Sequence, residues 1–176
     1  MTGSSVVGGI CGWCYHSNNS SIITNCINAG FIKGNGRVGG IIGVFTATAS
    51  GQAVSNCIST GVIIADTDIG AIIGGMGYNL NNATITNCHY DKQFCIHKGV
   101  NGQDVSGVYG HLTRNMVGRK LASLLGDTDW TYVEGATLIE SLYPQLKTLD
   151  HTDASKVGAI PIFLYDGMKD WEGGIP

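Results

Sequence analysis

Residues 7–12 read VGGICG, residues 38–43 read VGGIIG and residues 69–74 read IGAIIG. The segments align without gaps, and each begins 31 residues after the one before it. A second motif keeps the same offset, with ITNC at residues 23–26, VSNC at 54–57 and ITNC at 85–88. Two motifs that hold one period over three copies indicate an architecture of 31-residue repeats.

The residue types within the repeat predict strands rather than helices. Ile, Val and Thr are β-branched and favour strands, whereas Gly is unfavourable inside a helix. Short β-branched runs bounded by Gly and Asn are typical of strands separated by turns. Such a unit can return to its starting direction and stack on the next unit at about 4.8 Å. We therefore predict an all-β fold, a parallel β-helix of about three 31-residue coils within residues 1–100.

Stacking places equivalent side chains of successive repeats above one another, in ladders. The sequence predicts a Cys ladder at positions 26, 57 and 88 and an Asn ladder at 25, 56 and 87. Asn tolerates the left-handed backbone that a bend often needs. The Gly ladder at 12, 43 and 74 predicts places where a side chain would clash or where φ is positive. Gly9, Gly40 and Ala71 form a further ladder that accepts only small side chains.

The composition supports a folded chain and argues against two classes of partner. Charged residues make up 13% and apolar residues 43%, which is not the signature of disorder. The net charge is −3 and the densest basic cluster is the pair Arg119–Lys120, so nucleic-acid binding is not expected. No stretch reaches the roughly 18 apolar residues of a membrane span, and the first ten residues do not resemble a signal peptide. Because the chain starts inside a repeat, we expect an N-terminally truncated array.

The combined pattern, Asn-Cys-x-x-x-Gly followed by Val-Gly-Gly-Ile-x-Gly, resembles the GLUG motif that is repeated in bacterial surface proteins and adhesins. The resemblance covers roughly residues 6–95 and implies a right-handed parallel β-helix. In the third copy Lys92 replaces the glycine found at Gly61, and no further VGGI segment follows. We therefore expect the array to end near residue 95.

Residues 101–150 predict a small α+β cap. Thr113 is an expected N-cap, Gly126 an expected helix end, and one short helix would carry the apolar stripe Val117, Leu121, Leu124 and Leu125. Residues 130–133 predict a strand, and residues 142–146 predict a turn into a final short strand. The order of a helix, a Trp and Tyr-Pro-x-Leu resembles the closing module of GLUG-type proteins. An open coil exposes strand edges, so we expect this cap to cover the end of the third coil. Residues 151–176 would form a linker or the start of another module.

The chain has six cysteines, which are candidates for a redox site, a metal site or disulfides. Cys11-x-x-Cys14 could be a redox pair or half of a zinc site completed by Cys95 and His97. The repeat argues against this, since Cys11 aligns with Ile42 and Cys14 with Phe45, which are core positions. In the Cys26–Cys57–Cys88 ladder the parallel Cβ vectors are poor for disulfides. We therefore expect buried free thiols there.

The remaining candidate residues predict no catalytic centre. Asp66 with Asp68, and Asp127 with Asp129, are paired carboxylates in turns, where Asp is common for backbone reasons; either pair could hold calcium weakly. Sequons begin at Asn18, Asn19 and Asn82 and mean little in a bacterial protein. The sequence thus predicts no catalytic, cofactor-binding or metal-binding residues and no cofactor.

We expect a non-catalytic structural or adhesive segment, a stalk or binding surface, of a larger bacterial cell-surface protein. The resemblance implies an extracellular location, and a host protein, a glycan or neighbouring modules as partners. Two alternatives stay open: the non-catalytic repeat region of a large secreted protease, and a β-helix carbohydrate-active enzyme. In the parent sequence, a cell-wall anchor would favour the adhesin and a His-Glu-x-x-His motif would favour the protease.

Overall fold

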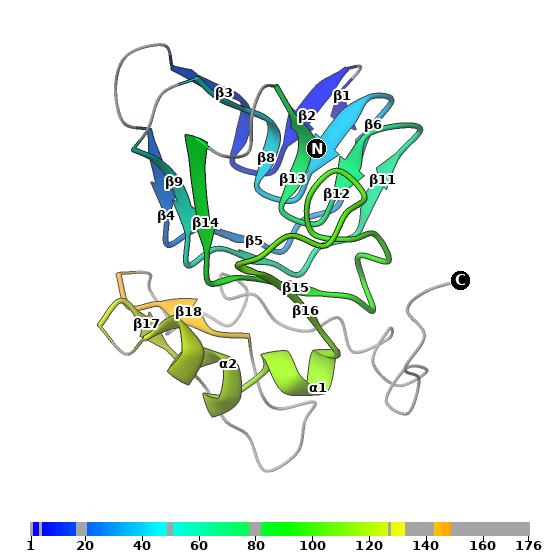
Figure 1. Ribbon diagram of the computed structural model, residues 1–176. Coiled ribbons are helices and arrows are strands. Elements are labelled where there is room, and N and C mark those ends of the chain that lie inside the picture. Colours follow the sequence, from blue (N-terminus) through cyan, green and yellow to red (C-terminus); the bar gives the residue numbers. More distant parts are fainter. Residues whose placement is uncertain are drawn as a thin grey trace.

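The computed structural model describes residues 2–3, 5–16, 21–48, 51–77, 82–126, 128–132 and 143–148. The described chain is mostly β-strand, arranged in parallel sheets, an all-β architecture similar to a parallel β-helix. Figure 1 shows the sheets of the repeats surrounding a common interior. Within the described residues, no helix has the length and apolar character to cross a lipid bilayer.

Each repeat unit contributes five short strands. The first unit, residues 1–31, holds β1 (Thr2–Gly3), β2 (Val6–Gly8), β3 (Cys11–His16), β4 (Ile22–Thr24) and β5 (Ile27–Asn28). The second unit, residues 32–62, holds β6 (Ile32–Gly34), β7 (Arg37–Gly39), β8 (Ile42–Ala47), β9 (Gln52–Ser55) and β10 (Ile58–Ser59). The third unit, residues 63–93, holds β11 (Ile63–Ala65), β12 (Ile69–Gly70), β13 (Ile73–Met76), β14 (Ala83–Thr86) and β15 (Cys88–Asp91).

The strand register confirms the 31-residue alignment. Cys11 pairs with Ile42, and Ile42 with Ile73, all in parallel. Ile23, Val54 and Ile85 align in the same way in the β4–β9–β14 sheet. In each of the five sheets of the repeats, the strand of the second unit lies between those of the first and third, so each strand of the first unit is an edge strand.

The interior is filled by the apolar ladders. The second-unit residues Ile42, Phe45, Val54 and Cys57 are all 0% exposed. The Asn ladder has the predicted left-handed backbone, with φ of 54°, 50° and 52° at Asn25, Asn56 and Asn87. These bends let the chain change direction without a glycine.

Parallel stacking continues beyond residue 95, where the repeat pattern is lost. β16 (Val108–His111) pairs in parallel with β15, and Val100 bridges to Ile73. Cys95 and Val100 are buried in the same core as the ladders. Residues 94–107 therefore cover the third unit, a role that the sequence predicts for the later helical segment. Backbone hydrogen bonding does not require the repeat sequence, which is why the motif ends before the stack does.

The single helix predicted from Thr113 is wrong: there are two short helices, α1 (Thr113–Met116) and α2 (Arg119–Leu125). Gly118, with φ of 63°, breaks the helix between them. Thr113 is not the N-cap but the first residue of α1: Leu112 holds the N-cap position, and the Thr113 N–H donates to Gln93 Oε1 at 2.9 Å. Gly126 does end α2, as predicted, but Leu124 is 57% exposed and does not belong to the buried stripe.

The segment after β16 lies beside the stack and not over its end. We call the described parts of residues 113–148 the lateral segment; it includes the antiparallel pair β17 (Trp130–Thr131) and β18 (Gln145–Leu146). Its buried side chains pack on Ile58 of the second unit and Ile27 of the first. Figure 1 shows α1, α2 and β17–β18 along the outside of β15 and β16. The predicted position over the third unit is therefore wrong, and the predicted residues Val133 and 151–176 lie outside the described part.

Candidate functional site

The Cys-x-x-Cys motif lies on a strand and not at a helix N-terminus. Cys14 pairs with Phe45 in the β3–β8 register, and both thiols of the motif are half-buried. Burial, followed by the charge of Cys11, raises the pKa of Cys14, which leaves it a neutral thiol with little nucleophilic character. Cys95 and His97 belong to the segment over the third unit, at the opposite end of the stack. Among the described residues no group of three or more His, Cys, Asp or Glu side chains could hold a metal ion.

The Cys ladder consists of free thiols. Each thiol donates to the carbonyl oxygen two residues earlier, at 3.3 Å for Cys26, 3.2 Å for Cys57 and 3.4 Å for Cys88. Cys57 and Cys88 are fully buried as predicted, whereas Cys26 is only half-buried, because no described unit packs on its outer side. Contact with the Cys57 thiol, together with burial, raises the pKa of Cys26 well above that of a free thiol. The contact with the Cys57 thiol acts in the opposite direction on Cys88 and lowers its pKa. Because Cys57 and Cys88 are 0% exposed, both are shielded from reagents and are suited to packing.

Within the described residues, the carboxylates of the two predicted pairs do not gather into a metal-ligand set. Asp68 lies in an exposed bend and forms an ion pair with Arg37, at 3.7 Å between Nε and Oδ2. Asp129 accepts a hydrogen bond from Asn25 Nδ2 at 2.9 Å, while its predicted partner Asp127 lies outside the described residues. Of the sequons, Asn18 and Asn19 are likewise outside, and the Asn82 amide donates to Ala47 O at 3.5 Å.

The Asn ladder fastens the lateral segment to the stack. Asn25 Oδ1 accepts from Trp130 Nε1 at 3.4 Å, in addition to the Asn25–Asp129 bond. In the third unit, Asn87 Nδ2 donates to Leu124 O at 2.8 Å and to Asn56 Oδ1 at 2.7 Å. One segment is thus hydrogen-bonded to both the first and the third unit.

The hydrogen bonds of Asn87 continue into a pair of histidines, His89 and His111, and this pair was not predicted from the sequence. His89 lies where Ile58 and Ile27 stand in the other units, and it is 2% exposed. Its Nε2 lies 2.8 Å from Asn87 Oδ1, and its Nδ1 lies 2.9 Å from His111 Nε2. Because Asn87 Oδ1 can only accept, Nε2 of His89 carries the proton and Nδ1 accepts from His111. Burial, followed by the charge of His111, lowers the pKa of His89 to about 4.

A second buried polar contact joins the lateral segment to β15. Tyr143 Oη donates to Asp91 Oδ2 at 2.8 Å, and the Gln93 N–H donates to Asp91 Oδ1 at 2.9 Å. Asp91 is 0% exposed, and burial raises its pKa despite these hydrogen bonds. In the sequence, one feature of Asp91 could have indicated this contact: the equivalent residues of the other two units, Ala29 and Thr60, are uncharged.

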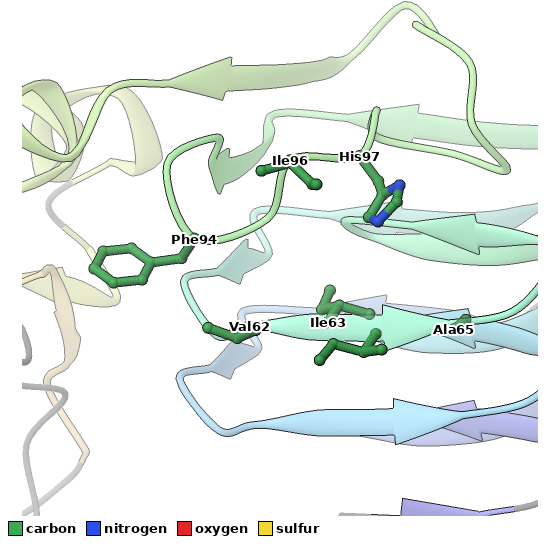
Figure 2. Close-up of a pocket in the computed structure, with 7 residues that line it drawn as sticks. Val62, Ile63, Ala65, Phe94, Ile96 and His97 are labelled. Carbon is green, nitrogen blue, oxygen red and sulfur yellow. The ribbon is translucent and has the colours of Figure 1, made fainter. Parts of the chain in front are cut away.

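A small apolar hollow of about 270 Å³ lies where residues 94–97 cross β11. Figure 2 shows Phe94, Ile96 and His97 on the crossing loop above Val62, Ile63 and Ala65 of the strand region. Ile96 is 55% exposed, and burial lowers the pKa of His97. A neutral imidazole beside apolar walls can make one hydrogen bond to a small ligand.

The larger of these two hollows, about 560 Å³, lies at the end of the first unit, which no described segment covers. Its walls include Cys11, Cys14, Ile23 and Cys26, which pack on the core from its open side. Trp13, at 60% exposure, and Ile22, at 65%, flank them. Exposed apolar side chains next to strand edges are typical of an interaction face.

Comparisons with protein-family models, with curated proteins and with solved structures found no match for this chain.

Proposed function

We propose that this chain is a non-catalytic structural segment, a stalk or spacer, of a larger bacterial cell-surface protein. The proposal includes the shape of the segment: the parallel sheets close a right-handed β-helix of about three coils, with an α+β segment along its side. The resemblance of the repeat to the GLUG motif supports an extracellular location. Neighbouring modules of the parent protein, a host protein or a glycan are the partners that such a segment implies.

The attachment of the lateral segment to the first and third units carries this proposal. In a stack of repeats each unit contacts only its neighbours, so units at an end can separate one at a time. Here the bonds at Asn25 and Asn87 tie the outer units to one segment. The apolar cluster around Ile58 anchors the same segment to the second unit. A stack braced in this way is expected to resist tension as one body, which is what a stalk requires.

Single-molecule force spectroscopy tests this proposal. With handles attached at Ser5 and Thr148, we expect one cooperative rupture that releases about 500 Å of chain, at about 3.5 Å per residue. Asn25→Gly keeps the left-handed backbone but removes the bonds to Asp129 and Trp130. The part of the first unit after the handle, residues 5–31, should therefore rupture separately, in a step of about 95 Å.

Asn101→Gly is the matched control, since Asn101 also has a positive φ of 46° but lies in the loop over the third unit. It should rupture like the unaltered protein. If the unaltered protein extends unit by unit at low force, the brace carries no load and the stalk proposal is wrong.

A further inference from the structure

The two ends of the repeat stack differ. At the third unit, the N–H groups of Ala71 and Ile72 donate to Lys98 O and Gly99 O, at 2.9 and 2.8 Å. The covering segment also buries Val100 to 1% exposure. No described segment covers the first unit in this way, and its strands β1 to β5 are all edge strands.

Side chains at equivalent positions show what the first unit lacks. Phe45 and Cys57 of the second unit are 0% exposed, because units pack on both sides of them. Their counterparts Cys14 and Cys26 are only half-buried, although they point into the same core. The first unit therefore presents the same apolar surface that the second unit presents to it.

The backbone of the first unit presents matching hydrogen-bond groups. The N–H groups of Ala53, Ile58 and Thr60 donate to Ser21 O, Cys26 O and Asn28 O, at 2.9, 2.8 and 2.8 Å. The equivalent donors one repeat earlier belong to Ile22, Ile27 and Ala29, on the uncovered edge. A parallel strand placed there would meet the same spacing of donors and acceptors.

Charge does not protect this edge. Residues 1–32 contain no Asp, Glu, Lys or Arg, although the whole chain has 23 of them. Exposed strand edges are usually blocked by charged residues or proline, which prevent pairing with another strand. The absence of both from the first unit leaves the edge competent for pairing.

We infer that the open face of the first unit is a docking site for one further 31-residue unit of the same repeat, joined by parallel backbone pairing. The geometry also sets a requirement on that unit. A Cβ on Gly39 would lie 2.6 Å from Gly74 N in the next unit, and a Cβ on Gly8 would lie 2.6 Å from Gly43 N. The docking unit therefore needs glycine at the equivalent position. This inference concerns the end of the stack and holds whether or not the protein is a stalk.

The test extends the full chain by one unit. Residue 32 is equivalent to residue 1, because Lys33 pairs with Thr2. A copy of residues 32–62 placed before residue 1 therefore keeps the register. Oxidation by hydroxyl radicals, which attack accessible sulfur whether or not the thiol is ionised, is read by mass spectrometry of each cysteine peptide. It should be about tenfold slower at Cys14 and Cys26 in the extended protein, because the added unit buries these two half-buried side chains.

The control extension, residues 32–61, shifts the pairing by one residue and turns the apolar side chains to the wrong face. It should leave Cys14 and Cys26 as reactive as in the unextended chain. Cys57 and Cys88 report folding, since they are buried in every folded variant. If the first extension exposes them, an extension with residues 1–31 repeats the experiment with a second register-matched unit.

Equal thiol reactivity with and without register-matched extensions would overturn the inference. So would sedimentation of the unextended chain as a dimer with Cys14 and Cys26 already protected, because the occupant would then be a second copy. Failure of both register-matched extensions to fold would overturn it as well.

Discussion

Lowering the pH should destabilise the protein through His89. The imidazole is 2% exposed and hydrogen-bonded on both nitrogens in its neutral form. Its pKa of about 4 in the fold compares with 6.5 for the unperturbed side chain. Between these values the unfolded chain binds a proton that the folded chain does not. The stability contributed by neutral His89 is therefore present above pH 6.5 and lost as the pH falls towards 4.

The size of the effect follows from the shift. Relative to pH 7, the free energy of unfolding falls by about 2 kcal/mol at pH 5 and by about 3 kcal/mol at pH 4. That is a large fraction of the 5–15 kcal/mol typical of a folded domain. His97 and His111 also have lowered pKa values and add to the loss in the same direction. Asp91 acts oppositely, because its raised pKa favours the fold as the pH falls.

The variant His89→Ile isolates the histidine, since it continues the ladder of Ile27 and Ile58 with a side chain that does not titrate. Urea unfolding at pH 7, 6, 5 and 4.5 gives the free energy of unfolding of both proteins. We expect the variant to be less stable at pH 7, because Asn87 and His111 lose a partner, but to have a shallower pH dependence. The groups near the pair, Tyr109 and Lys92, are common to both proteins. An unchanged slope in His89→Ile would refute the reasoning.

Three further predictions concern packing and backbone geometry. Gly39→Ala should destabilise the protein by about 3 kcal/mol, because the added Cβ would lie 1.9 Å from Ile42 O. Gly12→Ala, whose Cβ would lie 3.7 Å from the nearest atom, should change the stability little, so equal melting temperatures of the two variants would contradict the prediction. Asn56→Ala should lower the free energy of unfolding by about 2 kcal/mol, because Ala tolerates the φ of 50° poorly and the hydrogen bond to Asn87 is lost. Asn56→Gly should lower it less, because Gly accepts this φ; equal free energies of unfolding in the two variants would contradict the prediction. Leu121→Ala should cost about 2–5 kcal/mol because Leu121 is 0% exposed, while the exposed Leu124→Ala should be nearly neutral; similar losses in both would show that α2 does not pack as described.

The site residues show how far sequence reasoning reaches. The Asn ladder and its left-handed bends could be predicted, because backbone conformation at a turn depends on the residue itself. The same asparagines bind the lateral segment, which could not be predicted, because the Asn25–Asp129 bond joins residues 104 apart. His89 and His111 looked unrelated in the sequence and became a hydrogen-bonded pair only through the β15–β16 register.

The sequence by itself determined the parallel register of the repeats. A 31-residue period repeats one set of nearest-neighbour contacts, so the first copies of the motif already specify how the next unit pairs. Only the tertiary structure decided what covers each surface of the stack. The segment after β16 carries no repeat, and its apolar stripe would fit the end or the side of the stack equally well. The side was selected by Ile58 and Ile27, together with the buried Asp91–Tyr143 contact between residues 52 apart. Contacts of that kind depend on which surfaces the folded units leave open, and no local pattern encodes them.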